Sequence, residues 1–277
     1  MVPSISPLPA FTLAKIGAIF RRDARVTVSY AGNFALTWLA IVVEVVIAWY
    51  ISRLIPPSPN FGAGGAVVSY FQFLVVNFAF VHFQGAALNS FAETIREGQL
   101  TGTLEVVLAT PTTLPVLVLS SAAWSFTLTG LQTLTYLLIA MLFGLDLSRI
   151  NVLTAIVFLI LTIAAVSPLG VFAAALAMVI KKPGPIEYVS TASAQLFGGV
   201  FLPLSSLPIA MQAVGWCLPI THALIGFRAA TAGVPLADVA SDAIWLVVAS
   251  VVLMPFSLWL FARAVRKARI DGTLAMY

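Results

Sequence analysis

Long uncharged stretches dominate the chain. Four of them contain no acidic or basic residue: Leu54–Ala92, Val106–Leu145, Ile150–Ile180 and Tyr188–Phe227. Apolar residues occupy consecutive positions within them, whereas a strand of a membrane β-barrel alternates apolar and polar residues. Each stretch exceeds the ~20 residues that a helix needs to cross hydrocarbon, where backbone polar groups must be satisfied within the segment. The pattern therefore predicts an all-α membrane protein.

The breaks between the apolar segments predict six transmembrane helices in one domain, residues 33–262. The expected spans cover about residues 34–52, 66–91, 113–143, 152–180, 186–202 and 243–262. Residues 1–32 are expected to form a cytoplasmic N-terminal segment, and residues 263–277 a cytoplasmic basic tail. Prolines interrupt the apolar pattern at 203–227, and proline breaks a helix because it lacks a backbone donor. Short re-entrant or outer helices are expected there, before the sixth span.

Charge is scarce and unevenly distributed. Only 9% of the residues are charged and 61% are hydrophobic, whereas a soluble domain carries roughly a quarter of charged residues. With both termini in the cytoplasm, only three of the 14 basic residues lie outside: Arg53, Arg149 and Arg228. The positive-inside rule therefore predicts a multi-pass protein of the inner (cytoplasmic) membrane with both termini cytoplasmic. The net charge of +4 does not indicate nucleic-acid binding, and membrane lipids are the expected surroundings.

Residues 11–30 combine apolar and basic side chains at helical spacing. The charge comes from Lys15, Arg21, Arg22 and Arg25. Such an amphipathic helix lies at the membrane interface, held by apolar burial and by anionic lipid. The alternative is an ordinary positively charged tail before the first span.

The sequence lacks the motifs of several enzyme classes. None of its lysines precedes Ser or Thr, as a phosphate-binding loop requires, so the chain is not an ATPase by itself. The only histidines are His82 and His222, and the single cysteine, Cys217, excludes an internal disulfide. We therefore predict no catalytic residue, no metal and no bound cofactor in this chain, and we expect it not to be an enzyme.

One polar segment interrupts the membrane pattern between the second and third expected spans. Residues 91–111 read FAETIREGQLTGTLEVVLATP, and Leu104, Val107 and Leu108 share one helical face. Thr103 is a suitable N-cap, with Glu105 near the positive end of this short helix. An amphipathic helix that lies across the ends of two spans would transmit the motion of a partner protein to both spans. The alternative is a solvated loop with a surface helix.

This segment resembles the cytoplasmic coupling-helix region of type-2 ATP-binding-cassette (ABC) permeases. The matching positions are Glu93, Arg96, Glu97, Gly102, Thr103, Leu104, Glu105, Leu108, Thr110 and Pro111. A second stretch is similar to that family's apolar, proline-rich segment before the last span. Its matching positions are Pro203, Pro208, Trp216, Pro219, His222 and Arg228. Chain length, the expected six spans and the N-terminal helix extend the resemblance over the whole chain.

The resemblance implies a half-transporter whose energy comes from another chain. Two copies, or this chain and a related permease, would enclose the path, with a homodimer as the simpler arrangement. A cytoplasmic ABC ATPase dimer, which carries ATP and Mg, would bind the region around residues 93–110. Such permeases mostly export lipids, lipid-linked glycans, drugs or peptides. Two other classes stay open: an ion-coupled secondary transporter, which often has broken helices in both halves, and an intramembrane lipid-modifying enzyme.

Four polar residues within the expected spans are the candidates for a substrate path or gate: Glu44, Asn77, His82 and Gln84. A charged residue at the bilayer centre costs about 2.5–3.5 kcal/mol on insertion scales, and such residues usually face the protein interior. These four either line a substrate path or gate, or bond one helix to another. Glu44 and His82 are at comparable depth, so they can pair. Arg228, near the outer mouth, is expected to contact lipid headgroups.

Overall fold

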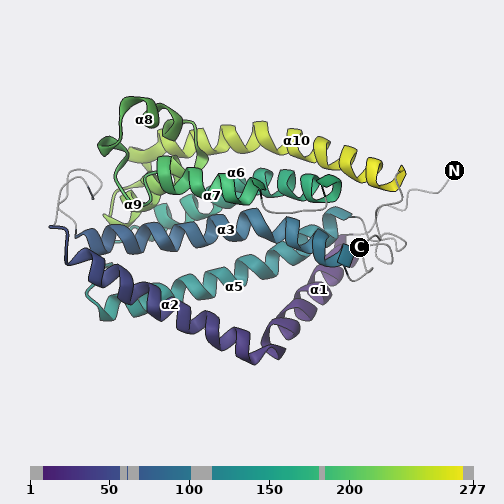
Figure 1. Cartoon of the computed structure of the whole chain (residues 1–277), viewed down its shortest axis with the longest axis horizontal. Coiled ribbons are helices and arrows are strands. Elements are labelled where there is room, and N and C mark those ends of the chain that lie inside the picture. Colours follow the sequence, from purple (N-terminus) through teal and green to yellow (C-terminus); the bar gives the residue numbers. More distant parts are fainter. Residues whose placement is uncertain (1–8, 57–60, 62–68, 101–113, 181–184, 271–277) are drawn as a thin grey trace.

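The computed structural model describes residues 9–56, 61, 69–100, 114–180 and 185–270. Its element order contains helices and no strand in this part of the chain. The longest helices, besides the N-terminal one, are α2 (Ala31–Ser52), α3 (Tyr70–Leu100), α5 (Leu114–Leu142), α6 (Val152–Ile180) and α10 (Ala240–Ile270). They run roughly alongside one another across the molecule (Figure 1).

Five segments of the described chain are helical, long and apolar enough to cross a membrane. They are Phe34–Ser52, Tyr70–Phe91, Ala123–Leu142, Val152–Leu176 and Leu236–Lys267. Each overlaps one of the spans expected from the sequence. A sixth is obtained if the bent helix pair before α10 counts as one span. The prediction of an all-helical, multi-span membrane protein is therefore confirmed.

The fifth expected span, residues 186–202, is not one continuous helix. The helix found there, α7 (Pro185–Phe197), has 13 residues. It extends about 20 Å at 1.5 Å per residue, less than the ~30 Å of a hydrocarbon core. The chain bends directly after it, where Gly199 adopts a φ of +80°, a conformation that glycine tolerates best. Apolar composition alone concealed this break.

The proline-rich segment forms short helices, as the sequence predicted. They are η1 (Leu204–Ser206), α8 (Ile209–Trp216) and α9 (Pro219–Thr231), and η2 (Leu236–Val239) follows before α10. Helices α8 and α9 meet at 86°. Pro203 and Pro208 directly precede η1 and α8, and Pro219 is the first residue of α9, where a missing N–H costs nothing.

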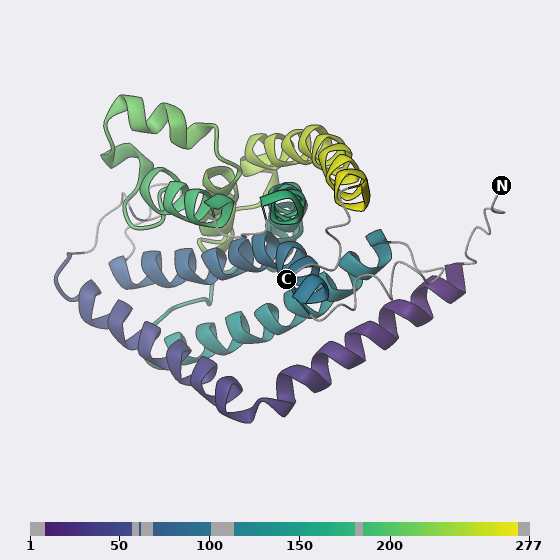
Figure 2. The same ribbon diagram turned by 45° about the vertical axis from the view of Figure 1, so that its right-hand side comes forward.

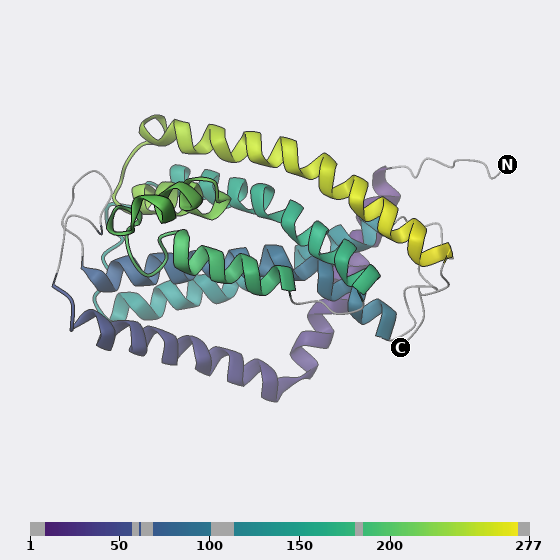
Figure 3. The ribbon, with the colours of Figure 1, turned by 45° about the horizontal axis from the view of Figure 1, so that its top comes forward.

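Helix α3 is the centre of the bundle. In its spanning segment 67% of the residues are buried, against 17% in α2 and 11% in α10. It packs against α5 on one side and α6 on the other, and α10 lies beyond α6 (Figures 1 and 3). One apolar cluster surrounds Phe80, Phe158 and Leu224, and another surrounds Phe73 and Tyr136. The outward faces of α2 and α10 are therefore left for lipid or a partner.

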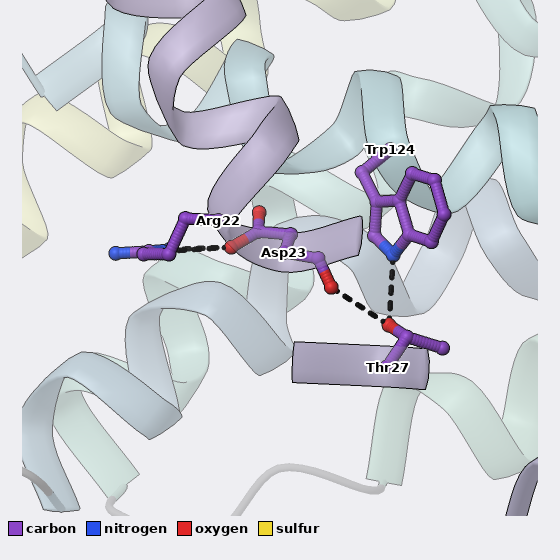
Figure 4. A network of polar contacts seen from close by, with 4 residues as sticks. All are labelled: Arg22, Asp23, Thr27 and Trp124. Carbon is purple, nitrogen blue, oxygen red and sulfur yellow. Dashed lines mark hydrogen bonds and ion pairs between the residues drawn. The ribbon is translucent and has the colours of Figure 1, made fainter. Parts of the chain in front are cut away.

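Helix α1 (Pro9–Ser29) leaves the bundle at an angle to α2 and packs against α5 (Figure 2). Nε1 of Trp124 in α5 donates a hydrogen bond of 3.0 Å to the hydroxyl of Thr27, which itself donates to the carbonyl of Asp23 at 2.9 Å (Figure 4). Arg22 forms an ion pair with Asp23, and the ring of Phe20 meets Trp124 edge-on. A helix therefore forms where the sequence predicted one, and its position at the membrane interface stays a prediction.

Candidate functional site

A polar cluster joins α3, α9 and the bend after α7, and we call it the Arg228 cluster. Nε of Arg228 donates to Oδ1 of Asn77 at 2.8 Å, and Nδ2 of Asn77 donates to the carbonyl of Val200 at 2.8 Å. Nη2 of Arg228 donates to the carbonyl of Gly199. Its guanidinium also lies over the ring of Phe73, 4.4 Å from the centroid. The cluster thus satisfies two carbonyls of a bend that makes no regular helix.

This geometry corrects the expected location of Arg228 and favours one of the two roles expected for Asn77. Arg228 was expected to contact lipid headgroups, but its guanidinium points inward to Asn77, because the carbonyls of the bend need donors that lipid does not supply. Asn77, which is fully buried, was a candidate for a substrate path or for a bond between elements. Its two hydrogen bonds favour the second role. The hydroxyl of Tyr70, two turns earlier in α3, extends the contact by donating to the carbonyl of Phe201 at 2.9 Å.

His222 connects α8, α9 and α10. Its Nδ1 lies 2.7 Å from Oδ1 of Asp242, and its Nε2 lies 2.9 Å from the carbonyl oxygen of Trp216. A neutral imidazole carries one N–H, so only the protonated ring donates to both acceptors. The ring also stacks on Trp245, with centroids 4.3 Å apart. His222 therefore holds the α8–α9 bend against the first turn of α10.

Glu44 and His82 form the pair that the sequence allowed. Oε2 of Glu44 lies 3.2 Å from Nε2 of His82, and the two side chains are 31% and 29% exposed. The ring of Tyr136 in α5 meets the imidazole edge-on at 5.7 Å. Glu44 also lines an open groove of about 380 Å³ on α2, whose other walls are apolar and include Phe78. The pair bonds α2 to α3, and Glu44 of the pair also lines this groove.

Gln84, also on α3, lines a separate cavity of about 420 Å³. Its side chain is 3% exposed, and Oε1 has no hydrogen-bond partner among the residues that the structure describes. Glu44, Asn77, His82 and Gln84 are thus not brought together into one site. They fall into three places: the α2–α3 pair, the Arg228 cluster and this cavity.

The predicted coupling residues begin on α3 itself. The helix does not stop at the end of its apolar part but continues to Leu100, so it carries Glu93, Arg96 and Glu97 at i, i+3 and i+4 spacing. Glu93 is exposed. The other predicted coupling positions, Gly102, Thr103, Leu104, Glu105, Leu108, Thr110 and Pro111, lie outside the described residues.

Several contact residues were missed by sequence reasoning. Asp242 and Trp245 hold His222, but Asp242 lies directly before the expected last span and Trp245 lies within it, so neither was singled out. Tyr136 and the two cavity serines, Ser190 and Ser193, sit in apolar runs without any motif. A weak signal existed for Asp242 only, because an acidic residue in the first turn of a membrane helix usually has a partner.

The described fold and polar contacts define a multi-pass helical membrane protein without a nucleotide-binding loop in its sequence. The profile of the ABC-2 family transporter proteins matches residues 55–259, which is more than half of the chain. The chain belongs to this family and is therefore the permease of an ABC transporter, a class of membrane subunit that normally works with an ATPase subunit. Comparison with curated proteins returns no match.

Proposed function

We propose that this chain is the permease subunit of an ATP-driven exporter. Its cargo is a lipid, a glycolipid or polysaccharide, or a drug-like amphipathic molecule, carried across the cytoplasmic membrane. ATP and Mg are bound and hydrolysed by a separate cytoplasmic ATPase dimer. Two copies of this chain, or this chain and a related permease, enclose the path. Membership of the family supports the proposal, and the direction and cargo go beyond it.

The observation that carries the proposal is the extension of α3. Between Phe91 and Leu100 the helix continues for about 13 Å beyond its apolar part. It ends at the same end of the bundle as the start of α1 and the end of α10 (Figure 1). The end of α10 carries Arg263, Arg266 and Lys267, and by the positive-inside rule these charges support a cytoplasmic assignment of this end. A rigid helix end that carries acidic residues is suited to receive the motion of an ATPase.

The coupling role is tested by charge reversal. Glu97→Lys and Glu105→Lys are expected to reduce co-purification of the ATPase by at least about 10-fold, or about 1.4 kcal/mol. Each variant removes a hydrogen-bond acceptor and reverses the charge at the proposed interface. Affinity purification of the tagged chain, with ATP hydrolysis and mass spectrometry of the eluate, measures the association. Asp146→Lys, in the exposed loop at the opposite end, is the matched control. Retained association and ATP-dependent transport in both variants would contradict the assignment and favour a secondary transporter or a membrane enzyme.

The proposed orientation is tested with the only cysteine of the sequence. Cys217 is exposed and lies between α8 and α9, at the end of the bundle opposite to the start of α1 and the end of α10 (Figure 1). A membrane-impermeant maleimide is therefore expected to label Cys217 in intact cells. In the variant Cys217→Ser with Gly102→Cys, labelling is expected only after the membrane is permeabilised. The reverse pattern would place the α3 extension outside the cell and end the coupling argument.

A further inference from the structure

An apolar cavity lies between α3, α6, α7 and the start of α9. Its volume is about 420 Å³. Its walls are formed by Gln84, Val166, Leu169, Phe172, Val189, Ser190, Ser193, Leu218, Pro219 and Ile220. None of these residues is charged, so the lining offers no partner for an ionic group. A neutral, mostly apolar molecule is what such walls accept.

One residue of this lining, Gln84, carries a buried polar atom that lacks a partner among the described residues. Oε1 of Gln84 accepts no hydrogen bond from the described residues, although the side chain is 3% exposed. A buried acceptor without a donor costs about 1–3 kcal/mol, so such an atom calls for a donor from elsewhere. A single water would need two to four polar partners. The lining offers few: beside Gln84 there are Ser190 and Ser193, and the hydroxyl of Ser193 already donates to the carbonyl of Val189 at 2.6 Å.

We propose that this cavity binds the apolar chain of a neutral amphiphile whose hydroxyl or amide N–H donates a hydrogen bond to Oε1 of Gln84. The amphiphile supplies both things that the cavity lacks: hydrocarbon against the aliphatic walls, and one donor for the unpaired oxygen. As a cargo site, the cavity rests on the proposed function, since it narrows the cargo to molecules with an uncharged donor beside an alkyl chain.

The position of the cavity connects its occupant to the α8–α9 bend. Leu218, Pro219 and Ile220 form one wall, and these residues lie at the point where the two helices meet at 86°. Another part of the wall comes from α7, which ends shortly before the Arg228 cluster. A molecule in the cavity therefore contacts both α7 and the α8–α9 bend.

The site is tested with photoactivatable dodecanol and its methyl ether, which have the same chain but differ in the O–H donor. Both probes are titrated against the full chain in detergent, and saturable cross-linking to peptides that contain 166–172 or 189–193 is measured. We expect the alcohol to bind about 3- to 10-fold more tightly than the ether, the factor that one net hydrogen bond provides. Equal affinities, or no saturable cross-linking in these peptides, would overturn the proposal.

Two variants and a control locate the effect. Gln84→Leu keeps the apolar contact and removes the acceptor, so it is expected to bind alcohol and ether equally, with the ether affinity of the unmodified chain. Ser193→Phe fills the cavity and is expected to weaken both probes. Gln72→Leu makes the same chemical change in the same helix, outside the cavity, and keeps the preference. If Gln84→Leu still binds the alcohol more tightly than the ether, the proposed hydrogen bond to Gln84 is wrong. The ratio of alcohol to ether affinity in the unmodified chain tests the site even where a variant does not fold.

Failure of this site and failure of the proposed function give different results. Binding is measured on the chain alone, without an ATPase, so absent binding overturns the cavity and leaves the coupling argument intact. Specific binding without ATP-driven movement of the alcohol across vesicles that contain the complex would leave the site and overturn its role in export.

Discussion

Replacing Gly226 with alanine is expected to destabilise the purified protein by about 1–3 kcal/mol, the usual effect of overpacking a closed core. Gly226 lies in α9 at the point where this helix crosses α6. A Cβ there would overlap the ring of Phe158, which is fully buried. Helix α9 would have to move away from α6, and apolar contacts would be lost in the cluster around Phe80, Phe158 and Leu224. Thermal unfolding in detergent, followed by circular dichroism, measures the loss.

A second glycine provides the control for this prediction. Gly85→Ala adds the same atom within α3, where the new Cβ meets nothing within 4 Å, and alanine suits a helix better than glycine. This variant is therefore expected to be unchanged or slightly more stable. The double variant Gly226→Ala with Phe158→Leu should lose less than the sum of its single losses, because the residues share one contact. Equal stability of the Gly226→Ala and Gly85→Ala variants would contradict the close approach.

The spans were predictable because they depend on composition along the chain. Runs of about 20 apolar residues predict a helix whatever lies beside them, and they located segments such as Phe34–Ser52 and Val152–Leu176. The end of α7 was not predictable in this way. It depends on carbonyls of Gly199 and Val200 that find donors on α3 and α9, and these contacts appear in no local pattern. The helical extension of α3 to Leu100 was missed because the polar residues there read as a loop.

The polar residues were found more easily than their roles. Asn77, His82 and Arg228 stand out because they interrupt apolar runs. The partners of Asn77 and Arg228 do not stand out. Asn77 and Arg228 are 151 positions apart, and Arg228 is also bound to a backbone carbonyl, which every residue carries. Sequence reasoning therefore assigned Arg228 to the membrane surface from its place at the end of an uncharged stretch. The fold assigns it to the interior, since α9 turns this side chain toward α3.

The two locations of Arg228 lead to different stabilities in detergent. If the guanidinium contacted lipid headgroups, its removal would change little once the lipid is gone. In the Arg228 cluster, Arg228→Met leaves Oδ1 of Asn77 and the carbonyl of Gly199 without donors, and each unpaired acceptor costs about 1–3 kcal/mol. We therefore expect a loss of about 2–6 kcal/mol in the free energy of unfolding, measured by thermal and denaturant unfolding of the purified chain.

Related variants separate the charge from the hydrogen bonds. Arg228→Lys keeps a cation but loses the planar fork that reaches two acceptors, so an intermediate loss is expected. Arg149→Met removes an exposed arginine and should stay within about 0.5 kcal/mol of the unmodified chain. In the background Asn77→Leu, the further change to Met at 228 should cost less, because one of the two acceptors is already gone. A loss in Arg228→Met no greater than in Arg149→Met would return Arg228 to the lipid surface and leave the bend after α7 without its main donor.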